Sequence, residues 1–111
     1  MSAVTSILIV KALDGLSARA SATAENIANA NSPGFRPLRV SFEQALAAAA
    51  PGGEGAIRAV APHLAGAPPG EHVRLDLELA TASSTALRYS ALTELLGREL
   101  QIEALGITGE R

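Results

Sequence analysis

Few side chains in this 111-residue chain have the type and spacing that catalysis or metal binding requires. His63 and His72 are the two histidines, and both lie in a segment rich in proline and glycine. Metal binding and acid–base catalysis need groups that a rigid scaffold holds in a fixed geometry. We therefore interpret both histidines as solvated loop residues, and we expect neither a metal site nor a cofactor.

The carboxylates and serines show no catalytic arrangement either. Asp76 and Glu78 are two residues apart, a spacing that points them away from each other on a helix. No serine lies in a Gly-x-Ser-x-Gly context, and "PGGEG" lacks the preceding strand and the Lys-Ser/Thr ending of a phosphate-binding loop. The sequence therefore predicts a protein that is not an enzyme.

Asparagine is concentrated in "AENIANANSPGF", residues 24–35, where three asparagines fall within six residues. Asparagine side chains bond nearby backbone groups, and so favour helix ends and turns. The Ser-Pro-Gly-Phe stretch predicts a type II turn with Pro33 second and Gly34 third. This explains the stretch from Asn31 onward.

The same reasoning leaves Asn26 and Asn29 unexplained, because both fall within the last heptad of a predicted helix. Their side-chain amides can donate and accept hydrogen bonds. We predict that these two amides fix the register between helices or between subunits.

Two long amphipathic helices are predicted, at about residues 4–30 and 74–105. In each, apolar or small residues alternate at spacings of four and three, as in a heptad seam. The first seam is Ile9, Leu13, Leu16, Ala20, Thr23, Ile27 and Ala30. The second seam is Leu75, Leu79, Ala82, Ala86, Tyr89, Thr93, Leu96 and Leu100. Additional apolar residues broaden the second stripe, which favours more than one neighbour: Leu87, Leu92, Leu95 and Ile102.

The segment between the helices has a different composition. Residues 47–72 contain four of the six prolines and five of the ten glycines, which predicts a flexible arm. Residues 36–46 predict an extended stretch followed by a short helix.

We therefore expect an all-α fold in which two long terminal helices pair as an antiparallel coiled-coil-like hairpin. The middle of the chain is expected to be irregular and partly extended. The predicted parts are the amino-terminal helix (1–32), the turn, short extended or helical segment and flexible arm (33–72), and the carboxyl-terminal helix (73–111).

Composition limits what the isolated chain can do. Its net charge of −2 gives no sign of a nucleic-acid footprint, and it has no cysteine. Apolar residues make up 48% of the chain but aromatic residues only 3%, and much of the apolar fraction is alanine. Alanine buries little surface, so we expect a thin core and a need for partners. We expect neither a cleaved signal peptide nor a membrane span.

"ENIANANSPGF" resembles the Asn-Asn-Ile-Ala-Asn-x-x-Thr-Pro-Gly-Tyr signature near the amino terminus of bacterial flagellar axial proteins. Within that family, the chain is most similar to the proximal rod proteins of the FlgB type. There the signature is followed by a Val-x-Phe-Glu-x-x-Leu stretch, here Val40, Phe42, Glu43 and Leu46. "LRYSALTELLGREL" also resembles the closing helix of that type. Three positions depart from the usual Asn, Thr and Tyr of the family: Glu25, Ser32 and Phe35.

The resemblance implies a structural subunit of the flagellar basal-body rod that assembles helically around the export channel. The implied partners are further copies of the chain, other rod proteins, the adaptor at the MS-ring junction and the export gate, with no nucleic acid. The implied location is the periplasmic rod, reached through the flagellar type III apparatus. The alternatives are another short rod subunit, or a helical-hairpin adaptor or export chaperone.

The resemblance also indicates which residues would lie at subunit interfaces: Asn26, Ile27, Ala28, Asn29, Asn31, Pro33, Gly34 and Phe35. The residues that we expect to form the paired helix seams are Leu13, Leu16, Ala20, Leu79, Ala86, Tyr89, Leu92, Leu96 and Leu100.

Overall fold

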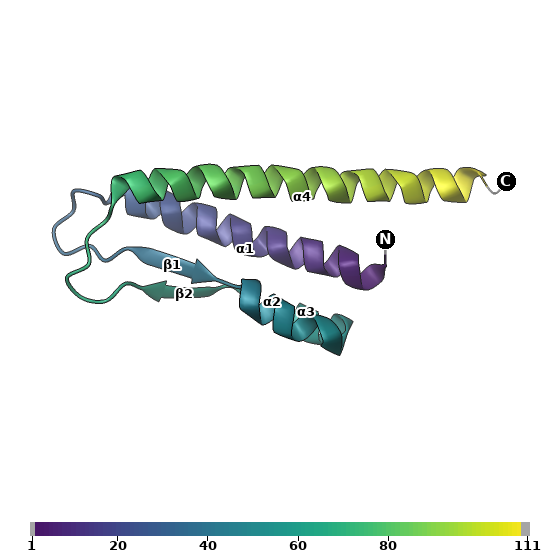
Figure 1. Ribbon diagram of the computed structural model, residues 1–111, viewed down its shortest axis with the longest axis horizontal. Helices are drawn as coiled ribbons and strands as arrows, with labels where there is room; N and C mark the ends of the chain where they lie inside the picture. Colours follow the sequence, from purple (N-terminus) through teal and green to yellow (C-terminus); the bar gives the residue numbers. More distant parts are fainter. Residues whose placement is uncertain (1, 110–111) are drawn as a thin grey trace.

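The computed structural model describes residues 2–109 and is mostly helical. Two long antiparallel helices, α1 and α4, lie side by side and give the molecule principal extents of 64 × 26 × 13 Å (Figure 1). Their bounds are Ala3–Ala28 and Leu75–Gly109, close to the predicted ranges. Glu110 and Arg111, which belong to the predicted carboxyl-terminal part, lie outside the described residues.

The first helix begins and ends with side-chain hydrogen bonds. Ser2 is the N-cap of α1, and its hydroxyl accepts a hydrogen bond from the Thr5 backbone N–H at 3.1 Å. At the other end, the Asn29 backbone N–H and its side-chain Nδ2 both donate to the Glu25 carbonyl. Asparagine therefore ends α1 by satisfying a carbonyl of its last turn.

The middle segment is more regular than the sequence predicts. The expected extended stretch and short helix are present, but the residues after them also form short elements, so the prediction of an irregular arm is wrong there. After the short helix, only residues 53, 59–62 and 67–74 of the middle segment lie outside helix and strand. The elements are β1 (Leu38–Ser41), α2 (Glu43–Ala49), a 3₁₀ turn (Ala50–Gly52), α3 (Glu54–Arg58) and β2 (His63–Gly66).

Proline and glycine separate these elements instead of forming a flexible run. Gly53 has a φ of 85° and is the N-cap of α3, while Pro62 directly precedes β2. Ile57 of α3 is fully buried. The two strands pair antiparallel, with Leu38 opposite Gly66 at one end. The fold is therefore two long helices with a small two-stranded sheet, and not all-α.

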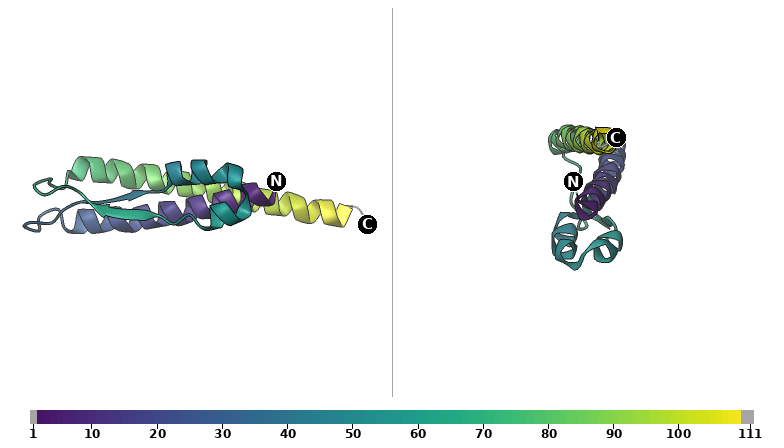
Figure 2. Two further views of the ribbon diagram at one scale, coloured as in Figure 1. Left: turned by 90° about the horizontal axis from the view of Figure 1, so that it is seen from below. Right: turned by 90° about the vertical axis from the view of Figure 1, so that its right-hand side faces the viewer.

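The apolar core lies on one side of α1. In Figure 2, α1 lies between α4 and the middle segment, and it contacts both. The buried apolar cluster joins α1 to β1, α2 and α3, while Leu92 is the one residue of α4 that packs against it among the described residues. The members of the cluster are Leu16, Ala22, Val40, Phe42, Leu46 and Ile57.

A glycine lets the middle segment approach α1 closely. Gly15 lies in the interior of α1, and a Cβ atom built there would overlap the ring of Phe42. Glycine is unfavourable inside a helix by roughly 1 kcal/mol relative to alanine, so this position gives up helix propensity for the contact.

We predict that Gly15→Ala destabilises the chain by about 1–3 kcal/mol, because overpacking against Phe42 outweighs the gain in helix propensity. Gly97 is the matched control, since it lies inside α4 with no atom near its Cβ position. We expect Gly97→Ala to leave stability unchanged or to raise it by about 0.5–1 kcal/mol. Urea denaturation followed by circular dichroism measures both, and equal effects would contradict the packing argument.

Candidate functional site

The first asparagine of the 24–35 stretch is buried and bonded within the chain. Asn26 is 1% exposed. Its Nδ2 donates to the Leu38 carbonyl at 2.9 Å, and its Oδ1 accepts from the Leu38 backbone N–H at 2.8 Å. The amide therefore bonds the outer edge of β1 as a neighbouring strand would. The amide of Asn26 is thus bonded within the chain, so of the two predicted roles it fits the register between elements of one chain, and a role between subunits stays a prediction.

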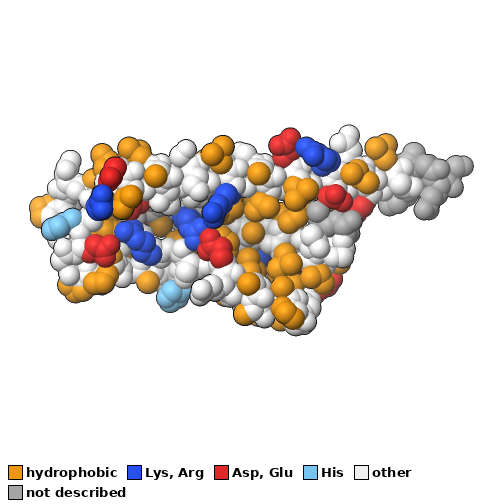
Figure 3. Space-filling view, in the orientation of Figure 1, with side chains coloured by type: hydrophobic (Ala, Val, Ile, Leu, Met, Phe, Trp, Pro, Cys, Tyr) orange, Lys and Arg blue, Asp and Glu red, His pale blue; other side chains and the backbone are white. Residues whose placement is uncertain are grey.

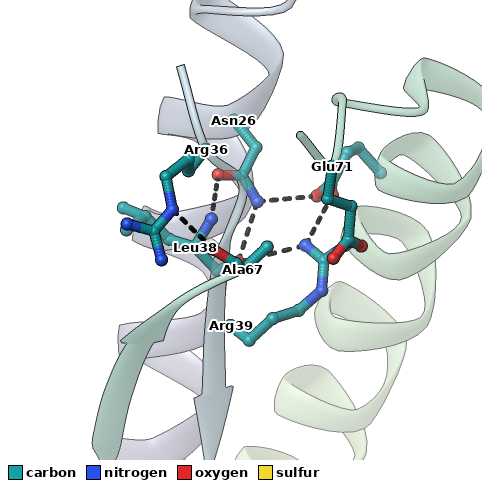
Figure 4. Close-up of polar contacts among 7 residues, drawn as sticks. Asn26, Arg36, Leu38, Arg39, Ala67 and Glu71 are labelled. Atoms are coloured by element: carbon teal, nitrogen blue, oxygen red, sulfur yellow. Dashed lines mark hydrogen bonds and ion pairs between the residues drawn. The ribbon is translucent and has the colours of Figure 1, made fainter. Parts of the chain in front are cut away.

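The same amide also reaches the start of α4. Asn26 Nδ2 donates to Glu78 Oε2 at 3.1 Å, and Arg39 Nη1 donates to Glu78 Oε1 at 3.0 Å (Figure 4). Glu78 is 4% exposed and lies in the first turn of α4, where a negative charge is favourable. We call Asn26, Leu38, Arg39 and Glu78 the clasp, because they join α1, β1 and α4.

A second pair of hydrogen bonds closes the end of the hairpin. The Ala67 backbone N–H donates to the Pro37 carbonyl at 2.8 Å. Proline has no N–H with which to return this bond. The Arg36 side chain supplies the missing donor, since its Nε bonds the Ala67 carbonyl (Figure 4).

The remaining asparagines lie at the surface near the turn. Asn29 is half-buried, and its Oδ1 accepts from the Ser32 hydroxyl at 3.1 Å. Asn31 is exposed.

The turn that follows the asparagines has the predicted geometry. The Phe35 backbone N–H donates to the Ser32 carbonyl, and Gly34 has a φ of 75°, so the predicted type II turn is confirmed.

An arginine–carboxylate pair fixes the corner between β1 and α2. Arg19 donates to both oxygens of Glu43, at 2.7 and 2.8 Å, and also to the Val40 carbonyl at 2.8 Å. Its guanidinium lies 4.9 Å from the centre of the Phe42 ring. The hydrogen bonds from Arg19 lower the pKa of Glu43 to about 2, against a smaller opposing effect of burial. The same bonds raise the pKa of Arg19.

The predicted seam of α4 meets α1 only in part. Glu78 and Thr85, which are not seam residues, are the buried residues of α4 in the described part of the chain. Three predicted seam residues are half-buried: Ala82, Leu92 and Leu96. Four large residues of the seam are 43–54% exposed: Leu75, Leu79, Tyr89 and Leu100. The pairing of α1 with α4 is present, while the individual contacts of the two seams stay a prediction.

The first seam fits the structure better. Leu16 and Thr23 are buried, and Leu13 and Ile27 are half-buried. Ala20 is exposed.

A groove of about 450 Å³ runs between α1 and α4 on the side of the helix pair that carries the two predicted seams. Ala20 and Ile27 line it from α1, and Ala86 and Tyr89 line it from α4. On the other flank, a groove of about 640 Å³ separates α4 from the hairpin. Charged side chains gather around that second groove (Figure 3). Both flanks of α4 are thus open, while α1 covers the side between them.

Both histidines lie at the surface. His63 lies on β2, and His72 lies in the irregular stretch before α4; both are exposed. Among the described residues, no three metal-ligating side chains come together. No helix in the described part of the chain combines the length and apolar character that crossing a membrane requires.

Sequence reasoning missed most of the clasp. The sequence pattern around Glu78 indicates only its spacing from Asp76, and nothing in the sequence around Arg39 indicates an ion pair. The one available signal was Asn26 itself, a polar residue adjoining the apolar seam position of Ile27. Such a residue needs bonding partners when it is buried.

We predict that Asn26→Ala destabilises the chain by about 2–4 kcal/mol, because it leaves the Leu38 backbone groups without their partner. Asn31→Ala is the matched control, since Asn31 lies five residues away in the same stretch and is exposed. We expect that change to alter stability by less than about 0.5 kcal/mol. Denaturation midpoints measure both variants, and a mild effect of Asn26→Ala would show that the clasp contributes little.

The Arg19–Glu43 pair predicts a specific acid dependence. A carboxylate whose pKa is lowered on folding stabilises the protein above its ordinary pKa of 4.5, and that stabilisation is lost as pH falls toward about 2. We therefore expect the stability difference between the native chain and Glu43→Gln to be largest above pH 4.5 and to shrink toward pH 2. Glu54→Gln is the matched control, since it removes an exposed carboxylate of α3 and leaves the bonds between Arg19 and Glu43 intact. Parallel trends in the two variants would contradict the assignment.

Comparison with known proteins leaves the family open. No protein-family model and no curated protein matches the chain. The resemblance to flagellar axial proteins, over roughly residues 8–46 and 73–102, consequently stays a prediction from the sequence.

Proposed function

We propose that this chain is a structural subunit of the bacterial flagellar basal-body rod, of the proximal type. It assembles helically around the export channel and links the MS ring and export gate to the rest of the rod. Support comes from the asparagine-rich stretch at the end of α1, from the Val-x-Phe-Glu-x-x-Leu stretch after it, and from the pattern of α4.

The exposed seam of α4 is the observation that carries this proposal. Its residues follow heptad spacing along most of α4, yet α1 covers them only in part, and Leu75, Leu79 and Leu100 stay about half exposed. A long apolar stripe on a soluble chain marks a contact with another macromolecule. Heptad spacing suits a second helix as that partner, with side chains packing knobs into holes.

The shape of the molecule suits a filament. The chain is long and thin, and α4 is covered on one side only. A helix with two open flanks can contact two neighbouring subunits. Contacts of this head-to-tail kind generate a helical assembly when they do not close into a ring. In the proposed rod, the coiled-coil-like packing therefore joins α4 to helices of neighbouring copies or of other rod proteins.

We predict that Leu79→Ser combined with Leu100→Ser prevents rod assembly while leaving the chain folded. Both residues are 54% exposed, so their loss costs the isolated chain little, but it removes apolar surface from the proposed contact. The measurements are swimming in soft agar and the rod content of purified basal bodies. The bacterium tested is the one that encodes the chain, with its gene replaced by each variant.

The matched control is Leu105→Ser, because Leu105 is a leucine of the same helix, 64% exposed, that belongs neither to the seam nor to the residues that broaden it. We expect normal swimming with this variant and equal amounts of protein on immunoblots. A motile strain lacking the gene altogether would refute the rod assignment. Normal swimming of the double seam variant would instead refute the role of the seam.

A further inference from the structure

The outer edge of β2 is uncovered. All four residues of β2 (His63–Gly66) are exposed, and β1 is the only strand that pairs with it in the described part of the chain. Seen from below in Figure 2, β2 lies on the outside of the molecule, with the two long helices behind it. An uncovered strand edge offers unpaired backbone groups to another strand.

The hydrogen-bond pattern shows which residues offer these groups. Residues 37 and 67 form a bonded pair through the Ala67 N–H, and bonded pairs alternate along an antiparallel ladder. In the observed register, Arg39 and Ala65 are the next bonded pair. The residues between them direct their N–H and C=O groups away from the hairpin.

The two edges of the hairpin differ in how these outward groups are used. On β1, the outward N–H and C=O of Leu38 are both bonded by Asn26. On β2, the outward groups belong to Leu64 and Gly66, opposite Val40 and Leu38. No other backbone or side chain of the described structure bonds them.

This edge lacks the usual protection against pairing. Natural edge strands carry charges, proline or bulges that prevent contact with another strand. β2 contains no Lys, Arg, Asp, Glu or Pro, and its Leu64 side chain is 58% exposed. Pro62 and Pro68 flank the strand and limit any pairing to a few residues.

We infer that β2 pairs antiparallel with β2 of a second copy of this chain, around a two-fold axis through Ala65. The N–H and C=O of Leu64 then face the C=O and N–H of Gly66 in the second copy, and Gly66 faces Leu64 of that copy in the same way. All four outward backbone groups of each β2 strand are thereby hydrogen-bonded. The Leu64 side chain lies opposite a residue without a side chain. Nη2 of Arg36 lies 3.6 Å from the Cβ position of Gly66, so the leucine side chain would meet the Arg36 guanidinium there.

The resulting dimer is a continuous four-stranded sheet in the order β1-β2-β2-β1. Its interface is small, so the association is weak and depends on protein concentration. A two-fold contact closes on itself and does not propagate. The dimer is therefore a form of the free chain, separate from the filament contacts of α4, and it does not depend on the proposed function.

Cysteine trapping tests this register directly, since the chain has no cysteine of its own. The two copies of Ala65 form a non-hydrogen-bonded pair with Cα atoms about 4.5 Å apart. That distance lies within the range in which a disulfide forms, about 4.4–6.8 Å. We expect Ala65→Cys to oxidise to a disulfide-linked dimer about tenfold faster than Ala47→Cys, an exposed alanine of α2, because pairing raises the local thiol concentration.

A second variant separates pairing from chance collision. Leu64→Lys, added to Ala65→Cys, places a like charge on each copy and should reduce the trapping rate to that of Ala47→Cys. Circular dichroism checks that the fold is retained, which we expect because Leu64 is exposed. Equal trapping of Ala65→Cys and Ala47→Cys, or trapping that Leu64→Lys leaves unchanged, would overturn the inference.

Discussion

The side-chain amide of Asn26 is the contact on which the arrangement of the elements depends. It lies on α1, bonds both backbone groups of Leu38 on β1, and donates to Glu78 on α4. A shift of either neighbour along α1 breaks at least one of these bonds inside a buried site, where an unpaired polar group costs about 1–3 kcal/mol. Alanine offers no hydrogen bond there, and aspartate would bring a second carboxylate against Glu78. A short asparagine thus fixes the position of two elements relative to a third.

The position of the apolar core explains why the contact between α1 and α4 depends on these hydrogen bonds. The core joins α1 to the middle segment, and α4 contributes Leu92 at its margin. Toward α1, the most buried residues of α4 are Glu78 and Thr85, which are polar. The chain has few aromatic residues, and Phe42 lies in the core beside Gly15. Little large apolar surface remains for the contact between α1 and α4, so hydrogen bonds at the start of α4 set its orientation.

The two long helices could be predicted because helical spacing is local, and the turn because Pro33 and Gly34 restrict their own backbone. The hairpin could not, since Leu38 and Gly66 lie far apart in sequence and their pairing depends on tertiary contacts. The Ala/Gly/Pro composition of residues 47–72 gives no sign of the role of Ile57, a fully buried side chain that packs in the core with residues of α1. The burial of Glu78 was missed for a related reason: apolar spacing alone cannot show that it would lie opposite Asn26.

These contacts divide the asparagine-rich stretch into parts with different roles. Asn26 belongs to the interior, Asn29 ends α1, and Asn31 lies exposed beside the turn. Asn26 and Arg39 hold Glu78 inward, and in this orientation of α4 three large seam residues, Leu75, Leu79 and Leu100, stay about half exposed. We propose that in a rod subunit the stretch acts on assembly through this orientation, because the amide of Asn26 is itself buried within the chain.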